Sequence, residues 1–304
     1  MMQSVRDTWA QLRAVSPQFL MLMLGLYAIS LLTNGGRYRA VLAGLGVDLT
    51  LLRASAMNWS CIFVSNVTPG KVGGELFRVL LLRQQCGVDV ALGGVAQGYD
   101  RLTDVLPMAL LVVGALPTLR AVLRLSWPGG QIGLAAIAVV ACLAGAVLLF
   151  RRADRLRARL RGWRDRLQRY QISRARWAAA QSLGFLLVVL DLLRLAVAGQ
   201  AFGVDMAPSQ VVALAAVMLV GGLSPTLGGL GVVEGGLTAA LVLFGVPLPK
   251  ALAVALFERA VSYGVGTAGG GIALLLLGGG QLWRSLRRRA DGADAAAAAQ
   301  GTGA

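Results

Sequence analysis

Two stretches of this sequence place ionisable side chains among glycine and proline residues in a pattern suited to binding an anion. The first, VTPGKVGGELFR, covers residues 67–78, and the second, SPTLGGLGVVEGG, covers residues 224–236. Proline has no amide hydrogen to donate and glycine accepts strained dihedral angles, so both stretches should interrupt a helix and leave backbone amides unpaired. Those amides, with the positive end of the helix that follows, form a receptor for an anion such as phosphate. Lys71 and Arg78 would add positive charge to that receptor.

Further acids and arginines stand close together in the apolar parts of the chain. Asp100 and Asp104 are four residues apart with Arg101 between them, and Glu75 and Arg78 share a helix face on which they can pair. An ionisable side chain in a membrane helix is energetically costly, so it usually faces the bundle interior or a wet cavity and takes part in function. The alternative is a structural role, in which neutralised pairs tie helices together. The same pattern recurs in later apolar segments at Asp191, Arg194, Glu258 and Arg259.

The two interrupted stretches belong to an internal repeat. Segments 68–101 and 224–259 each begin with a hydroxyl residue and proline, then pass through a glycine-rich turn to an acid. Each continues into a short apolar helix, breaks at Gly-Val and reaches an acid followed by arginine, and the breaking glycine stands thirteen residues before Asp100 or Glu258. Paired short hydrophobic segments interrupted by glycine and proline are a pointer to a transporter binding site near the membrane midplane.

The rest of the composition indicates a membrane protein. Of the 304 residues, 57% are hydrophobic, well above the share in a soluble domain. Apolar runs close to the ~20 residues needed to cross the hydrocarbon core recur along the chain, the first from Pro17 to Thr33. We therefore predict an all-α, multi-pass membrane protein with about seven or eight transmembrane helices, counting two broken or re-entrant hairpins at residues 56–82 and 208–246. The repeat is expected to be inverted.

The formal net charge of +15 is placed in a way that indicates membrane topology rather than nucleic-acid binding. An arginine-rich loop, 151–176, joins the predicted repeat halves, 34–150 and 177–283, within one membrane domain of residues 1–283. By the positive-inside rule this loop is cytoplasmic, and so is the C-terminal tail 284–304, whose Ala/Gly/Asp content predicts disorder. Beyond setting topology, the loop is a candidate amphipathic surface for anionic lipids.

Several classes of active site are disfavoured. The chain has no histidine and its three cysteines stand at no metal-like spacing, so no metal site is expected. The phosphate-binding pattern GxxxxGK[ST] is missing, which counts against ATP-driven transport by this chain, and the nucleophile pattern GxSxG is missing as well. We accordingly predict no catalytic residue, no cofactor and no enzymatic activity.

At these motifs the sequence resembles the lysylphosphatidylglycerol synthase transmembrane-region, or flippase-like, family over about residues 37–277. It departs from the family pattern at Asp100, where the family usually has glutamate, and at Leu227, where the family has a second proline. The matching residues are Pro69, Gly70, Lys71, Gly73, Gly74, Glu75 and Arg78, then Asp100, Arg101 and Asp104, then Ser224, Pro225, Gly228, Gly229, Gly231, Glu234 and Arg259.

The resemblance implies a role in moving lipids between the leaflets of the bacterial inner membrane. In bifunctional members of the family, aminoacyl transfer belongs to a separate soluble C-terminal domain, whereas this sequence continues into a short Ala/Gly-rich tail, so synthase activity is not expected. The expected partner is a membrane phospholipid or a lipid-linked molecule. A second copy of the chain is a further candidate partner, and nucleic acid is not.

The predicted mechanism passes a lipid headgroup through a charged interior while the acyl chains stay in the bilayer. The acids would hold a cationic headgroup, pair with the arginines when the site is empty, or carry a coupling proton. The alternatives are a carrier of a small solute or ion with the same repeat, a membrane-embedded enzyme that modifies a lipid, and a scaffold for an assembly complex. The predicted substrate-binding residues are Lys71, Gly73, Gly74, Glu75, Arg78, Asp100, Arg101, Asp104, Ser224, Gly229, Glu234, Glu258 and Arg259.

Overall fold

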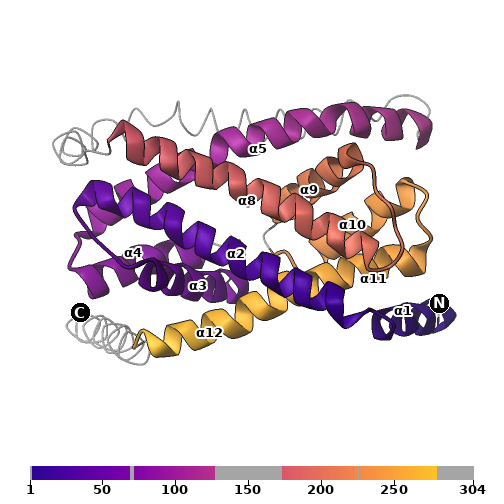
Figure 1. Cartoon of the computed structure of the whole chain (residues 1–304), viewed down its shortest axis with the longest axis horizontal. Helices are drawn as coiled ribbons and strands as arrows, with labels where there is room; N and C mark the ends of the chain where they lie inside the picture. The colour runs from indigo at the N-terminus through magenta and orange to yellow at the C-terminus, as the bar shows by residue number, and fades with distance from the viewer. Residues whose placement is uncertain (1, 69–71, 127–172, 223, 225, 279–304) are drawn as a thin grey trace, which may run out of the picture.

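The described part of the chain consists of helices joined by short loops (Figure 1). The computed structural model describes residues 2–68, 72–126, 173–222, 224 and 226–278. The helices are α1 (Met2–Arg13), α2 (Pro17–Leu42), the 3-10 helix η1 (Ala43–Leu45), α3 (Leu51–Val67), α4 (Val72–Cys86), α5 (Val90–Ser126), α8 (Arg174–Gln200), α9 (Pro208–Gly222), α10 (Val232–Leu243), α11 (Leu248–Arg259), the π-helix η2 (Ala260–Val265) and α12 (Gly266–Leu276). Some predicted features lie outside the described residues, namely Lys71, Pro225, residues 151–172 of the arginine-rich loop and the tail 284–304.

Within the described residues, three helices, α2, α5 and α8, are long and apolar enough to cross a membrane, and α9 and α10 are shorter apolar helices. Local sequence explains where α2 begins: Ser16 is the N-cap residue, its hydroxyl accepts a hydrogen bond from the Gln18 amide, and Pro17 occupies the first turn, where no amide is needed. The expectation of an all-helical membrane protein is confirmed, although α2 continues well beyond the apolar run that was expected to end at Thr33.

The long helices α2 and α8 lie side by side and run in opposite directions (Figure 1). Near the start of α8, the Arg176 guanidinium donates to the Ala43 carbonyl just after the end of α2, at 2.8 Å. Near the other ends of the two helices, the Arg194 guanidinium lies 5.5 Å from the centre of the Tyr27 ring. The two helices therefore run antiparallel along most of their length.

The two interrupted stretches form helical hairpins, α3 with α4 and α9 with α10, whose arms pack against each other. Their four helices contain 17, 15, 15 and 12 residues. At 1.5 Å per residue these arms are about 18 to 26 Å long, shorter than the ~30 Å hydrocarbon core. In the first hairpin α3 ends at Val67 and α4 begins at Val72, and in the second α9 ends at Gly222 and α10 begins at Val232, so each hairpin changes direction at one of the predicted stretches.

The glycine expected to end each short helix does so. Gly87 follows α4 with φ +68°, and Gly245 follows α10 with φ +87°, a left-handed conformation that favours glycine. In both halves the next helix begins three residues later, α5 at Val90 and α11 at Leu248. The sequence repeat is therefore also a repeat of backbone conformation.

The inner ends of the two hairpins touch. Gly228 (φ +57°) lies so close to Asn66, the penultimate residue of α3, that a Cβ at this glycine would be 3.3 Å from the Asn66 Cα and carbonyl oxygen. The Tyr263 hydroxyl donates to the Asn66 carbonyl at 3.2 Å, and the Asn66 amide nitrogen donates to the Thr267 hydroxyl at 2.9 Å. These contacts bring both interrupted segments together at one place in the bundle.

Helix α2 joins two hydrophobic clusters. Met23 and Tyr27, on its first half, pack with α8 and with α9 to α11, and Tyr38 and Val41, on its second half, pack with α3 to α5. Because the same helix contributes to both clusters, its central residues lie where the two halves of the bundle meet. Polar side chains at that place are therefore in a position to be shared by both halves.

Candidate functional site

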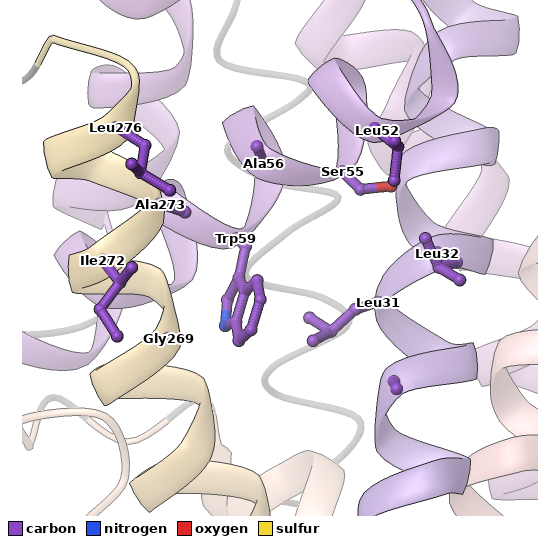
Figure 2. A pocket seen from close by; sticks show the side chains of 11 residues that line it. Leu31, Leu32, Leu52, Ser55, Ala56, Trp59, Gly269, Ile272, Ala273 and Leu276 are labelled. Carbon is purple, nitrogen blue, oxygen red and sulfur yellow. The ribbon is translucent and has the colours of Figure 1, made fainter.

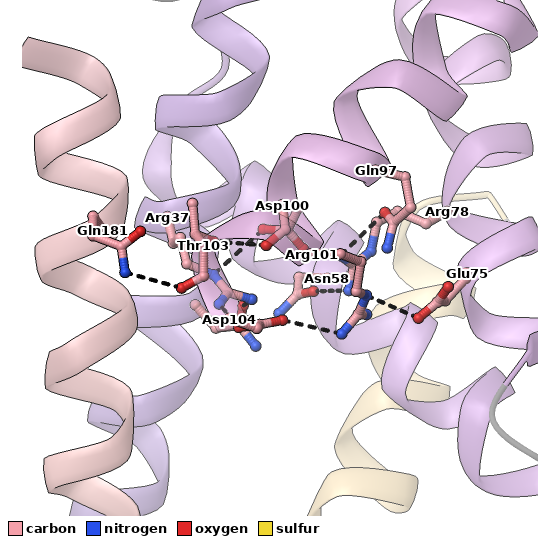
Figure 3. Close-up of polar contacts among 11 residues, drawn as sticks. Arg37, Asn58, Glu75, Arg78, Gln97, Asp100, Arg101, Thr103, Asp104 and Gln181 are labelled. Atoms are coloured by element: carbon pink, nitrogen blue, oxygen red, sulfur yellow. Dashed lines mark hydrogen bonds and ion pairs between the residues drawn. The ribbon is translucent and has the colours of Figure 1, made fainter. Parts of the chain in front are cut away.

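The first half of the bundle contains a buried carboxylate that binds two arginines. Asp100 on α5 is completely buried, and its side chain accepts a hydrogen bond from Arg78 on α4 at 2.8 Å. The Nε atom of Arg37 on α2 lies 3.3 Å from the other Asp100 carboxylate oxygen. Arg78 also donates to the Asn58 side-chain oxygen on α3 at 2.6 Å and lies 5.1 Å from the Tyr38 ring centre. This network holds α2, α3, α4 and α5 together (Figure 3).

A more exposed layer of charges covers this network. The Arg101 side chain, about half exposed, pairs with Glu75 on α4 at 2.9 Å and with Asp104 at 3.1 Å (Figure 3). Arg37 also donates to Asp104. The possible pairing of Glu75 with Arg78 within α4 is not formed. Glu75 pairs instead with Arg101 of α5, and Arg78 pairs with Asp100 of α5.

The second half contains a corresponding buried pair. Arg194 on α8 pairs with the fully buried Glu258 of α11 at 3.0 Å and with Asp191, one turn earlier on α8, at 3.1 Å. The Ser262 hydroxyl donates to the second oxygen of Glu258 at 3.2 Å. Arg194 therefore holds two acids, as Arg37 does in the first half.

The second half also has an outer pair, beside the hairpin tip. Arg259 binds Glu234 of α10 at 2.8 Å and donates to the Gly228 carbonyl at 3.0 Å. The other Glu234 oxygen accepts a hydrogen bond from the Gly231 amide at 2.7 Å, so this acid caps the start of α10. The same arginine thus joins the tip of the second hairpin to the end of α11.

The ion pairs of the two halves have the same construction. Asp100 and Glu258 are each the eleventh residue of their helix, and each pairs with an arginine of the long first helix of its half. The arginine that follows each of these acids pairs with the acid in the first turn of the preceding short helix. The equivalent pairs are therefore Arg37–Asp100 with Arg194–Glu258, and Glu75–Arg101 with Glu234–Arg259. Arg78 has no equivalent, since Leu237 stands at the matching place.

A polar cavity of about 440 Å³ lies between α2, α5 and α8 and reaches both half-sites. Arg37, Arg101 and Asp104 line it from the first half, and Asp191 and Arg194 line it from the second. Three arginines and two aspartates give these walls a formal charge of +1. The other lining residues are Tyr27, Ser30, Leu31, Asn34, Ile62, Pro107, Met108, Gly184, Leu187 and Val188.

Sequence reasoning missed the polar face of α2. Tyr27, Ser30, Asn34 and Arg37 recur every three or four residues and line the cavity together. The spacing itself was the available signal, but it becomes visible only if the helix is extended past Thr33. Arg37 is the residue of this face that bears a charge and binds Asp100 and Asp104.

Several predicted residues lie elsewhere in the structure. Gly73 and Gly74 pack α4 against α3, and a Cβ at Gly74 would lie 2.6 Å from the Cys61 carbonyl oxygen. Ser224 bonds the nearby Thr226 hydroxyl at 2.9 Å, and Gly229 (φ +80°) forms part of the second hairpin tip. Contact of these residues with a substrate stays a prediction. Predicted site residues beyond the cavity walls are Gly73, Gly74, Glu75, Arg78, Asp100, Ser224, Gly229, Glu234, Glu258 and Arg259.

A family sequence model matches this chain along most of its length. The sequence model described as "Lysylphosphatidylglycerol synthase TM region" matches residues 2–270. A "UPF0104 membrane protein" of Methanothermobacter thermautotrophicus is 33% identical over 121 residues, which is 40% of this chain and 33% of that relative. The matched part thus spans about a third of the relative's length. No solved structure matches the chain significantly.

Proposed function

The chain belongs to the lysylphosphatidylglycerol synthase TM region family, and from that premise we propose that it carries lipids with a phosphate-bearing headgroup between the leaflets of the bacterial inner membrane. The observation that supports this most is the cavity that both half-sites share, with arginines from each half in its walls. A lipid headgroup crossing the bilayer needs polar partners on the way, because the hydrocarbon core offers none.

The length of the cavity suits such a passage. Along α2 its lining extends from Tyr27, beside Arg194, to Arg37, a separation of ten residues that corresponds to about 15 Å of helix. This is half of the ~30 Å hydrocarbon core. Arg37 and Arg194 would therefore provide two successive positions for the phosphate, and the Ser30 and Asn34 side chains lie between them on α2.

Arginine suits this role since its planar guanidinium binds phosphate oxygens in pairs and stays charged. Each cavity arginine is already held by acids, so binding a phosphate would exchange one charged partner for another instead of exposing a bare charge to lipid. Asp104 and Asp191 would then be free to bind a cationic group of the same headgroup, such as an amino group, or a coupling proton.

We infer that the two halves form an inverted repeat, with the hairpins α3–α4 and α9–α10 re-entering the membrane from opposite sides. The antiparallel packing of α2 and α8 and the equivalent ion pairs support this arrangement. Repeats of this kind let a central site open to each side in turn, as one half rocks against the other. Enzymatic activity is not part of the proposal, and binding of anionic lipids by loop 151–176 and self-association remain predictions.

Reconstitution into liposomes tests the proposal. Lipids with a fluorescent acyl chain are placed in both leaflets, and dye loss to an impermeant reductant is followed in protein-containing and empty vesicles. We expect dye loss to pass one half for phosphatidylglycerol and aminoacylated phosphatidylglycerol but not for a diacylglycerol glycolipid without phosphate. Equal transport of the phosphate-free lipid, or no transport of any lipid by folded protein, would exclude the proposed function.

The same assay compares the transport rates of variants in the cavity with that of a variant outside it. Arg37→Ala and Arg194→Ala should each slow transport at least tenfold, since each removes one phosphate position. Arg53→Ala is the matched control because Arg53 is exposed near the start of α3, outside the cavity, where it binds the Gln85 side chain. Its rate should be unchanged.

A further inference from the structure

A second cavity, of about 430 Å³, opens between α2, α3 and α12 (Figure 2). Its walls are almost entirely apolar. The polar side-chain groups that Figure 2 shows among them are the Ser55 hydroxyl and the Trp59 indole nitrogen. The lining residues are Ala28, Leu31, Leu32, Leu52, Ser55, Ala56, Trp59, Gly269, Ile272, Ala273 and Leu276. We call this cavity the apolar groove.

The groove is open to the outside of the bundle. Leu52 is 75% exposed, Ile272 60% and Leu276 82%, so its rim belongs to the surface that faces the acyl chains of the bilayer. Ala273, at its base, is buried. A ligand could thus enter sideways from the membrane without passing through water.

The floor of the groove is built around one tryptophan. The Trp59 indole nitrogen, on α3, donates to the Gly266 carbonyl of α12 at 3.1 Å, and this hydrogen bond holds the indole ring against α12. Gly269 lies directly under this ring, where a Cβ would overlap the indole. The absence of a side chain at Gly269 therefore lets the two helices hold a flat aromatic surface between them, with the groove above it.

The dimensions of the groove suit a single hydrocarbon chain. It extends from Leu52 to Trp59 along α3 and from Leu276 to Gly269 along α12, a separation of seven residues on each helix. This corresponds to about 10 Å, within the ~15 Å depth of one leaflet of the hydrocarbon core. The groove runs from the outer ends of α3 and α12 toward the middle of α2.

Leu31 connects the groove to the polar cavity, because it lines both. On α2 the groove involves residues 28–32, which fall within the 27–37 stretch that lines the polar cavity. The two cavities therefore lie side by side at the same depth, on neighbouring faces of one helix. One of them is lined by charged residues of both half-sites, and the other is lined by apolar residues.

We propose that the apolar groove holds one acyl chain of the lipid whose headgroup occupies the polar cavity, with Leu31 as the partition between them. This inference rests on the proposed function. An amphiphile has a charged end and an apolar end at a fixed short distance, and the pair of cavities offers both environments at that distance. Only the headgroup then needs polar partners from the protein, while the chain stays in contact with apolar side chains and bilayer lipid.

Photo-crosslinking tests the groove directly. Phosphatidylglycerol with a diazirine in the middle of one acyl chain is irradiated with the reconstituted wild-type protein, and labelled peptides are identified by mass spectrometry. We expect labels concentrated on peptides that contain Leu32, Ile272 and Leu276. Equal labelling of the exposed face of α5, for example at Val105 and Val113, would overturn the inference, since both are also lipid-facing.

Filling the groove provides the second measurement. Leu32→Trp adds bulk at the groove wall and should slow phosphatidylglycerol transport at least fivefold and remove the groove labels. Leu22→Trp is the matched control: it is the same change on the same helix, at a similarly exposed site outside the groove (49% against 42%), and it should leave both unchanged.

The two inferences fail separately. If Leu32→Trp transports lipid at the wild-type rate while Arg37→Ala is slow, the groove inference is wrong and the proposed function stands. If labels concentrate in the groove but no variant and no wild-type preparation transports lipid, the proposed function is wrong and the groove remains a lipid-binding site.

Discussion

Arg37 and Arg194 are equivalent residues of the two halves, and they lie in the wall of one shared cavity. Each extends from the long first helix of its half, binds a fully buried acid on the helix after the hairpin, and binds a second acid nearer the cavity. The buried acids hold the arginine side chains in place, and the outer acids are the ones a substrate could displace. A duplicated element thus supplies two binding positions of the same chemistry.

Replacing Asp100 with asparagine should strongly destabilise the protein. This carboxylate is fully buried between Arg37 and Arg78, so its loss leaves the buried Arg78 without the acid it pairs with and Arg37 with Asp104 as its remaining acid, at a cost of about 3–5 kcal/mol. The free energy of unfolding of the purified protein in mixed micelles measures this.

Asp191→Asn is the control for that measurement. The Asp191 side chain is 55% exposed and its partner Arg194 keeps Glu258, so the expected loss is no more than about 1 kcal/mol. If the two variants unfold with equal free energies, the buried position of Asp100 does not carry the stability assigned to it.

Glu75 and Glu234 should contribute differently to the stability of the protein, although they occupy equivalent positions in the two halves. Glu75 is about half exposed and binds Arg101, so Glu75→Gln should cost at most about 1 kcal/mol. Glu234 is largely buried, binds Arg259 and also accepts the Gly231 amide, so Glu234→Gln should cost about 1.5–3 kcal/mol. Thermal unfolding of both variants in detergent compares them, and a Glu75→Gln loss as large as that of Glu234→Gln would contradict the structure.

The repeat and its charged residues could be predicted because the spacing of residue types along the sequence is sufficient to recognise them. The glycine that ends each short helix and the acid thirteen residues later occupy equivalent places in the backbone. The pairing of these charged residues was harder to predict from the sequence. Arg78 and Glu75 were expected to pair because they are three residues apart, but Asp100 is the better partner since it is completely buried and needs counter-charges from other helices.

Arg37 could not be found from local sequence for a different reason. The segment TNGGRYR that follows the first apolar run contains two glycines and an asparagine, which usually indicate the end of a helix. In the structure α2 continues through it, and a Cβ at Gly35 would lie 2.6 Å from the Ser55 Cα of α3. Close packing with another helix therefore stabilises helix here, and that contact is invisible in a single segment of sequence.

Gly228→Ala should weaken the contact between the hairpin tips. The left-handed φ of +57° costs a side chain about 1–2 kcal/mol, and the new Cβ would lie 2.5 Å from the Tyr263 ring and 3.3 Å from the Asn66 backbone. We expect a lower unfolding temperature and slower lipid transport. Gly235→Ala, in α10, is the control because a Cβ there meets nothing within 4 Å, and it should be neutral or stabilising by about 1 kcal/mol. Identical unfolding temperatures for the two variants would argue against the tip contact.

The ends of the helices predict on which side of the membrane each loop lies. The start of α8 contacts the end of α2 through Arg176 and Ala43, and the end of α12 contacts α4 through Leu277 and Gln85. The start of α8 and the end of α12 therefore lie at the same end of the bundle (Figure 1), as the positive-inside rule requires if the arginine-rich sequences next to them are both cytoplasmic.

Cysteine labelling in spheroplasts checks this topology. In a background without Cys61, Cys86 and Cys142, we expect Gly46→Cys, in the loop after η1, to react with an impermeant maleimide only after the membrane is opened. Gly203→Cys, in the loop after the opposite end of α8, should react in intact spheroplasts, because α8 is long enough to carry the chain across. Reaction of both sites from the same side would be incompatible with a membrane-spanning α8. The antiparallel packing of α2 and α8, which brings Arg37 and Arg194 to one cavity, would then not lie across the bilayer.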